Sequence, residues 1–279
     1  MSIPEKLLSG VERLDPLPIT VQKLIIALNR EDLNTSEIIQ IVEYDAAVAA
    51  NILRAANSAA FGGRFQIDRL RDAVVRLGTT TLLNLVLGEH FRKIKTSAPL
   101  YDLSEDDIWL HGAAASLAVK AIIRETRPSK VAEAAGIAAL VHDIGKLIMV
   151  RYLDASVAKI LETCDQRKLS WVEAERELFG CDHAEVGGSM ARRWGFPDSI
   201  TDAIERHHQY PAENPSPMLD AVMLANLAAK SIGVGLGAAA LNMRIDDAGC
   251  RERIGLTIEG FERVCAQTSI WLHDFKNSG

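Results

Sequence analysis

The sequence predicts an all-α protein built as a multi-helix bundle. Apolar residues recur at helical spacing along most of the 279-residue chain, as in the series Leu70, Ala73, Val74 and Leu77. This spacing puts them on one face of a helix. Residues that start helices are matched by glycines that end them. No alternating run of polar and apolar residues bounded by hairpin turns occurs to predict a sheet.

Capping residues predict where several helices begin and end. An N-cap residue followed three positions later by an acidic residue has the pattern of a capping box, which occurs at Ser104 and Asp107, Ser170 and Glu173, and Asp182 and Glu185. A glycine at the end of an apolar helical pattern predicts a stop at Gly78, Gly145, Gly180 and Gly195. The last predicted helix covers residues 257–275.

Three zones divide the chain. Residues 1–97 are expected to form an N-terminal helical lobe, with many alanines that let helices approach closely. Residues 98–230 form the expected core and contain five of the seven histidines. Residues 231–279 form a C-terminal helical extension that begins with the glycine-rich stretch 233–237, which lacks the spacing of a dinucleotide-binding turn. We expect the lobe to pack on the core as one unit.

Composition and charge exclude several classes of protein. Apolar residues make up 48% and charged residues 24%, as in globular domains. The net charge of −6 gives no attraction toward nucleic acid or an anionic membrane. No apolar run reaches the ~20 residues of a membrane span, and the first residues do not resemble a signal peptide. The four cysteines lack CxxC spacing, so we expect a cytoplasmic protein without disulfides or a thiolate zinc site.

The pair His142-Asp143 is the main chemical signal. It follows an apolar run, and an imidazole nitrogen beside a carboxylate suits a divalent transition metal such as Fe, Mn, Zn or Ni. The alternative is a plain helix end, where His142 meets the helix dipole and Asp143 faces solvent. The pair is accompanied by histidines near helix ends or on apolar-faced helices, namely His111, His183, His207 and His208. This accumulation favours a metal site.

The order of these residues resembles the HD-domain superfamily of metal-dependent phosphohydrolases, in which a helical core holds one or two metals. The resemblance implies that Asp143 bridges two ions. It further implies that His111 and His142 bind one ion and that His183, His207 and His208 bind the other. Catalytic candidates are Asp143 and Lys146. Lys146 either contacts a substrate phosphate or is a cation at a helix C-terminus.

One position departs from the superfamily pattern. The closing aspartate belongs on the helix after the histidine doublet, and the matching stretch, 222–229, has Asn226 there. A neutral amide is a poorer ligand for a hard cation than a carboxylate. We therefore expect a weakened first metal position.

Motifs in the N-terminal zone are closely similar to the HDOD family, the HD-related output domain of bacteria. They lie at residues 14–18, 42–47, 52–58 and 73–78. The resemblance implies a signal-transduction output module with an HD-like, metal-binding but weakly active or inactive site. Its partner would be a signalling protein or a small ligand, not a nucleic acid or a membrane. The alternative is a metal-dependent phosphohydrolase acting on a nucleotide or phosphoester. Asn226 favours the module, whereas the retained histidines favour the enzyme.

Overall fold

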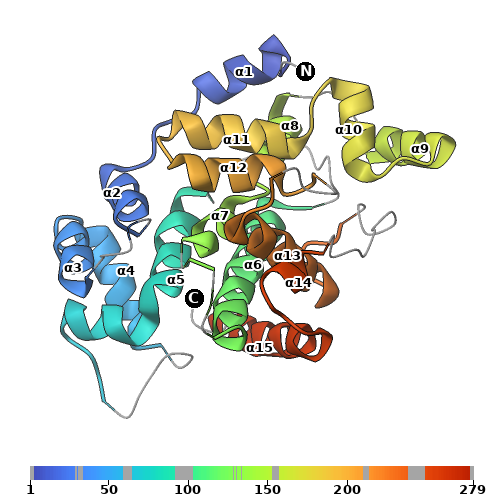
Figure 1. The fold of residues 1–279 in the computed structure, drawn as a ribbon. Coiled ribbons are helices and arrows are strands. Elements are labelled where there is room, and N and C mark those ends of the chain that lie inside the picture. Colours follow the sequence, from blue (N-terminus) through green and yellow to red (C-terminus); the bar gives the residue numbers. More distant parts are fainter. Residues whose placement is uncertain are drawn as a thin grey trace.

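The protein is all-α, and its described part contains fifteen helices and no strand (Figure 1). The computed structural model describes residues 3–28, 30, 34–58, 65–91, 103–127, 129, 131–132, 134–152, 157–209, 214–237 and 249–276. The helices are α1 (Glu5–Glu12), α2 (Ile19–Leu28), α3 (Thr35–Glu43), α4 (Ala46–Ala56), α5 (Leu70–Phe91), α6 (Glu105–Glu125), α7 (Ala135–Val141), α8 (Gly145–Tyr152), α9 (Val157–Arg167), α10 (Trp171–Phe179), α11 (His183–Arg193), α12 (Asp198–Arg206), α13 (Pro217–Ser231), α14 (Cys250–Arg253) and α15 (Ile258–Lys276).

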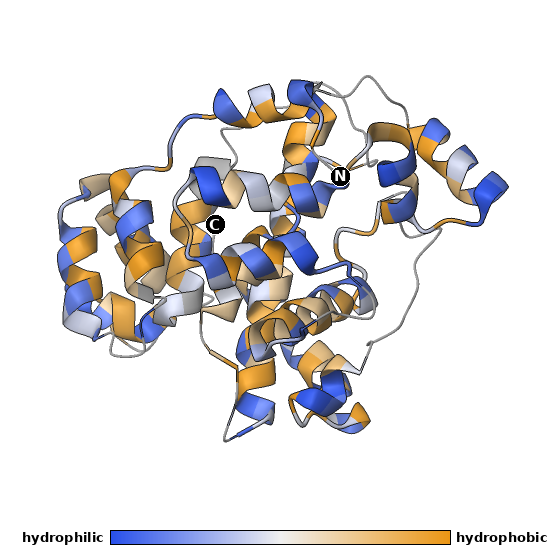
Figure 2. Ribbon diagram, turned by 45° about the horizontal axis from the view of Figure 1, so that its top comes forward, coloured by the Kyte–Doolittle hydropathy of each residue, from blue (hydrophilic) through white to orange (hydrophobic). Residues whose placement is uncertain are grey.

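Helix α6 lies at the centre of the core and packs against α7, α13 and α15 (Figure 1). Gly112 allows the approach of α7, because a Cβ at this position would lie 2.0 Å from the carbonyl oxygen of Leu140. Helices α11 and α12 pack on each other and on α8, α7 and α13. Outer helices carry hydrophobic and hydrophilic residues together (Figure 2), so their burial is one-sided.

The N-terminal helices α2, α3 and α4 gather on one side of α5, which joins them to α6 and α7 (Figure 1). Helix α1 lies apart from them and packs on α8 and α11. The expected limit between residues 97 and 98 falls outside the described residues. None of the described helices combines the length and the apolar character needed to cross a membrane.

The local signals set most helix limits as predicted. All three capping boxes are formed, at Ser104, Ser170 and Asp182. Gly180 and Gly195 have φ values of +76° and +73°. Gly78 interrupts the helical path within α5, with φ 73° and ψ 166°.

The predicted stop at Gly145 is wrong. Helix α7 already ends at Val141, residues 142–144 form a turn, and Gly145 is the first residue of α8. The glycine serves a tertiary contact, because a Cβ at this position would lie 2.0 Å from the carbonyl oxygen of His183. His142 and Asp143 are therefore neighbours in a turn between two helices rather than neighbours on one helix.

Candidate metal centre

The predicted site residues come from separate elements and meet at one buried point. His111 lies on α6, and His142 and Asp143 lie in the turn between α7 and α8. His183 is the first residue of α11, His207 is the C-cap of α12, and His208 follows it. The remaining candidate, Asn226, lies on α13.

The Asp143 carboxylate lies between two sets of imidazole nitrogens. Its Oδ2 is 3.6 Å from Nε2 of His111 and 3.6 Å from Nε2 of His142. Its Oδ1 is 3.1 Å from Nε2 of His183 and 3.6 Å from Nε2 of His207. Nε2 of His208 lies 3.1 Å from Nε2 of His183.

Two potential ligand groups therefore share one carboxylate. We call His111, His142 and Asp143 the first group, and Asp143, His183, His207 and His208 the second group. Within each group the candidate ligand atoms all lie within 4.8 Å of one another. The structure thus brings together all six residues that the resemblance implied as ligands, in the same division.

Helix ends orient two of the rings. The Nδ1–H of His142 donates to the carbonyl of Ala139 at 2.7 Å, and the Nδ1–H of His207 donates to the carbonyl of Ile204 at 2.7 Å. Each carbonyl lies three residues earlier, at the end of α7 or α12, where backbone acceptors are left unpaired. Both bonds turn Nε2 toward Asp143 and leave it free to bind a metal.

His111 is held from the glycine-rich stretch after α13. Its Nδ1–H donates to the carbonyl of Val234 at 2.8 Å, and Gly235 packs so closely that a Cβ there would lie 2.5 Å from the Cβ of His111. Oδ1 of Asn226 lies 3.1 Å from Nε2 of His111. Since the neutral ring has only a lone pair at Nε2 and the two ends of an amide are assigned from their hydrogen bonds, we assign the amide with its NH₂ toward Nε2. Asn226 therefore covers the atom that a metal would need.

His183 is supported by a carboxylate that sequence reasoning missed. Glu175 on α10 is fully buried, and its Oε2 accepts from the backbone N–H of His183 at 3.0 Å and from its Nδ1–H at 2.7 Å. Its Oε1 accepts from the indole N–H of Trp171 at 3.0 Å. A carboxylate behind a histidine fixes the ring and strengthens it as a metal ligand.

Lys146 is a buried counter-ion of Asp143. Its Nζ lies 2.5 Å from Oδ2, and the side chain is only 8% exposed. It stands in the first turn of α8, so its interpretation as a cation at a helix C-terminus is wrong. Sequence reasoning also missed Lys230 on α13, whose pKa is lowered to about 8 by burial and by the charge of Lys146. Lys146 contacts Oδ2, the oxygen that faces the first group, whereas the charge of Lys230 adds to burial in lowering the pKa of both His111 and His208.

Burial keeps the first-group histidines neutral. It lowers the pKa of His111 to about 3 and the pKa of His142 to about 3, so both rings present lone pairs at ordinary pH. Burial alone would raise the pKa of Asp143, but Lys146 and His142 outweigh it and hold that pKa well below its usual range. Two neutral imidazoles and a carboxylate are the protonation states that metal binding requires.

The second group differs because of the acid behind it. Burial opposes the charged form of His183, but Glu175 and Asp143 outweigh burial and raise its pKa to about 9. Burial and His207 lower the pKa of His208 well below its usual range. A metal at His183 would therefore displace the Nε2 proton of an imidazolium, with the Nδ1–H still donated to Glu175.

The donor atoms fit a divalent transition metal. Among the described residues, Nε2 of His142 and Nε2 of His207 have no hydrogen-bond partner, and both face the Asp143 carboxylate, whose Oδ1 lies 3.1 Å from Nε2 of His183. Unpaired buried polar atoms are costly, each by roughly 1–3 kcal/mol. A cation between them would satisfy both, and a nitrogen-rich set with one shared carboxylate suits Fe, Mn, Zn or Ni.

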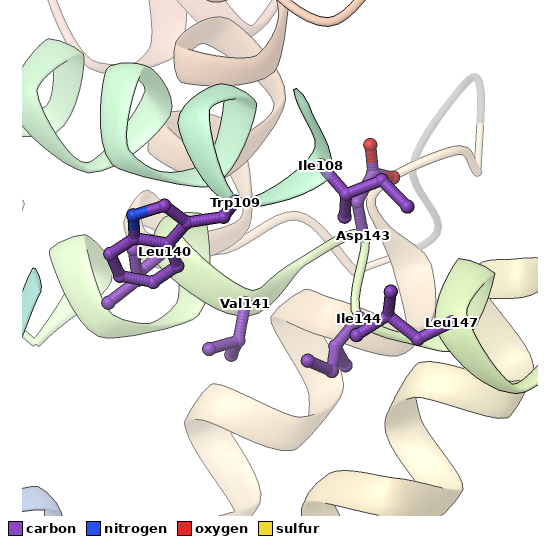
Figure 3. A pocket seen from close by; sticks show the side chains of 7 residues that line it. All are labelled: Ile108, Trp109, Leu140, Val141, Asp143, Ile144 and Leu147. Carbon is purple, nitrogen blue, oxygen red and sulfur yellow. The ribbon is translucent and has the colours of Figure 1, made fainter. Parts of the chain in front are cut away.

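A small cavity adjoins the centre. It has a volume of about 20 Å³ and is lined by Asp143 and six apolar or aromatic side chains, including Trp109 and Leu140 (Figure 3). This volume corresponds to about one water molecule. The cavity does not accommodate a phosphoester.

A helical core that gathers a His-Asp pair and four further histidines around a buried centre places the protein in the class of HD-type domains. The family model for the HDOD domain matches residues 14–210. The chain belongs to the HDOD family.

Solved structures share this fold. An HDOD domain protein of unknown function from Geobacter sulfurreducens has a TM-score of 0.74 and 21% identity, with 98% of this chain and 97% of that chain covered. A provisionally assigned signal transduction protein from Marinobacter aquaeolei has a TM-score of 0.73 and 20% identity, covering 98% and 65%. A provisionally assigned phosphohydrolase from Shewanella amazonensis has a TM-score of 0.61 and 24% identity, covering 95% and 98%.

A curated relative is an uncharacterized protein of Treponema pallidum (strain Nichols). It is 24% identical over 224 residues, which cover 78% of this chain. The matched region spans 43% of the length of that relative.

Proposed function

We propose that this protein is a regulatory module of bacterial signal transduction whose buried centre binds a divalent transition metal and hydrolyses phosphoesters weakly or not at all. The metal would hold α6, α11, α12 and the His142-Asp143 turn in one arrangement. The output would be the conformation of the module, recognised by a signalling protein or altered by a small ligand. The net charge of −6 supports a partner other than nucleic acid. The four free cysteines support a reducing, cytoplasmic setting.

The closure of the centre carries this proposal. His142 and His207 are fully buried, and Asp143 is 4% exposed. His208 is the one partly exposed member of the two groups. A substrate phosphate needs direct access to the metal ligands, and the neighbouring cavity has room for about one water molecule.

Asn226 supports the same conclusion. Hydrolysis at a two-metal site relies on cations that clamp the attacking and leaving oxygens. The Asn226 amide covers Nε2 of His111 and brings no negative charge to hold a second cation. The first group is therefore poorly suited to complete such a clamp.

A second candidate function is a metal-dependent phosphohydrolase. It is favoured by the two ligand groups that share Asp143, a geometry that can hold two ions. A bound metal would supply a water of lowered pKa as the nucleophile. Lys146 would hold a phosphate oxygen only after leaving Asp143, to which it is now paired at 2.5 Å.

The two functions are separated by metal analysis and turnover on the full chain purified without a histidine tag. We expect bound transition metal, and absent or very weak hydrolysis of generic phosphomonoesters and phosphodiesters in Mn²⁺ or Fe²⁺. His142→Ala should lose metal, whereas His273→Ala, an exposed histidine on α15, should keep it. Strong metal-dependent hydrolysis that disappears in His142→Ala but not in His273→Ala would establish the enzyme instead.

A further inference from the structure

Helices α9 and α10 form a hairpin at the edge of the molecule (Figure 1). The two helices pack chiefly on each other, and no other helix in the described part of the chain makes an extensive contact with either. The exposed face of α9 is strongly polar, with the ion pair Lys159–Glu162 more than half exposed. Apolar side chains on its inner side, such as Ile160 and Trp171, are buried, and the scarcity of contacts with other helices is what allows the hairpin to dock and undock as a unit.

The hairpin nevertheless reaches the candidate metal centre through Glu175. This side chain is fully buried and accepts three hydrogen bonds, two of them from His183. The backbone link is also short, since α10 ends at Phe179 and α11 begins at His183. Arg176 on α10 pairs with Asp182, the N-cap of α11, at 2.5 Å. The position of α10 thus determines how the ring of His183 is held.

We propose that Glu175 is a positioning residue that couples docking of the α9–α10 hairpin to metal occupancy of the second group. The proposal rests on the proposed function in one respect, namely that the centre binds a metal. When the hairpin is docked, Glu175 orients the ring of His183 and makes it a stronger ligand. When it is undocked, the ring loses its Nδ1–H bond to Glu175 and the backbone N–H of His183 loses the other. The docked state therefore binds the metal more tightly.

The coupling acts in both directions. If docking raises metal affinity by a given factor, metal binding raises the docking equilibrium by the same factor. Loss of a carboxylate behind a metal-bound histidine typically lowers metal affinity roughly tenfold to a hundredfold. We expect docking of the hairpin to raise metal affinity by a factor of this size. The hairpin would thus report the state of a centre that is itself buried, and a partner that holds the hairpin would tighten metal binding.

The charge of Glu175 is needed for this role. A glutamine at this position has nearly the same volume, but one of its two polar atoms is an NH₂ donor. It cannot accept from the indole of Trp171 and from both N–H groups of His183 at once. Glu173, on the same helix, provides a matched control, because its carboxylate accepts from Ser170 in an exposed capping box and does not touch the centre.

The test uses Co²⁺ as the probe, because its visible absorption reports the ligand set. Co²⁺ titrations and hydrogen exchange of residues 157–179, with and without Co²⁺, are measured on the full chain for the parent, Glu175→Gln and Glu173→Gln. In the parent, Co²⁺ should slow exchange of the hairpin. Glu175→Gln should bind Co²⁺ roughly tenfold to a hundredfold more weakly, with a changed spectrum and a smaller effect of Co²⁺ on exchange.

The control should separate positioning from mere stability. Glu173→Gln should speed exchange of the hairpin but leave the affinity and spectrum of Co²⁺ as in the parent. Unchanged affinity and spectrum in Glu175→Gln would overturn the positioning role. Bound Co²⁺ with unchanged hairpin exchange in the parent would overturn the coupling, and this measurement needs no variant to fold. Hydrolysis of phosphoesters would contradict the regulatory function alone, and a parent that takes up no Co²⁺ would contradict both.

Discussion

The two ligand groups around Asp143 contain the same residue types but have different surroundings. In the first group, the Asn226 amide contacts Nε2 of His111, and the ammonium of Lys146 lies 2.5 Å from Oδ2 of Asp143. In the second group, Glu175 lies behind His183, and Oδ1 of Asp143, which is not the oxygen paired with Lys146, lies 3.1 Å from Nε2 of His183. We therefore expect the charges and donors behind the ligands, and not the ligands alone, to decide which group holds a cation.

The second group should therefore be the tighter metal position. A cation in the first group meets a nearby lysine charge and must displace an amide NH₂ from the lone pair of His111. A cation in the second group must displace the Nε2 proton of His183. The Glu175 carboxylate behind that ring attracts a doubly charged cation more strongly than the proton that the cation displaces.

The shared carboxylate should support both groups. Asp143→Asn leaves the buried Lys146 ammonium without its counter-ion, and loss of one partner of a buried pair costs about 3–5 kcal/mol. We expect this loss in the free energy of unfolding from urea denaturation, together with loss of all metal binding. Asp165→Asn, at an exposed carboxylate on α9, should change stability by less than about 0.5 kcal/mol. Metal uptake by Asp143→Asn at the parent level would show that Asp143 is not shared.

The glycine stretch should matter for the first group alone. Gly233 and Gly235 have φ values of +81° and +64°, so alanine costs about 1–2 kcal/mol of strain at either position. A Cβ at position 233 meets nothing within 4 Å, whereas a Cβ at position 235 pushes on His111. Gly235→Ala should therefore be less stable than Gly233→Ala by about 1–3 kcal/mol. Only Gly235→Ala should weaken binding of a second metal ion. Equal stability and metal binding of the two variants would contradict this account of His111.

Asn226→Asp should repair the weaker group. The change is nearly isosteric and adds a negative charge where the amide now covers His111. We expect a roughly tenfold to hundredfold gain in affinity for the second ion to bind. Without metal, an unpaired buried carboxylate should lower the melting temperature, since Asn226 is 2% exposed. Thermal melts with and without Mn²⁺ should thus move in opposite directions relative to the parent. If the melting temperature changed neither with nor without Mn²⁺, Asn226 would not belong to a metal position.

The sequence was sufficient for features that depend on residues close together in the chain. The capping boxes at Ser104, Ser170 and Asp182 involve partners three residues apart. The order of the histidines and Asp143 was sufficient to predict that they meet, through the resemblance to HD-type domains. These are patterns of residue type and spacing, which a single sequence displays directly.

The surroundings of the ligands could not be predicted in this way. Glu175 lies on a helix with two other glutamates, Glu173 and Glu177, and its spacing does not distinguish it from an exposed acid. Val234 contributes a backbone carbonyl, which has no residue-type signature. Gly145 follows an apolar run and so resembled a helix stop. Its role is a close contact with the carbonyl of His183, a residue far along the chain that no local pattern indicates. Long-range packing determines all three.

The most direct test of the asymmetry compares Co²⁺ titrations of His183→Ala and His111→Ala, with His273→Ala as the control outside both groups. The second group should fill first in the parent. His183→Ala should therefore lose the tight phase of the titration, whereas His111→Ala should keep it with an affinity within about threefold of the parent, a difference of less than ~0.7 kcal/mol. A tight phase that survives His183→Ala and disappears in His111→Ala would show that the first group is the principal metal position and would contradict the account.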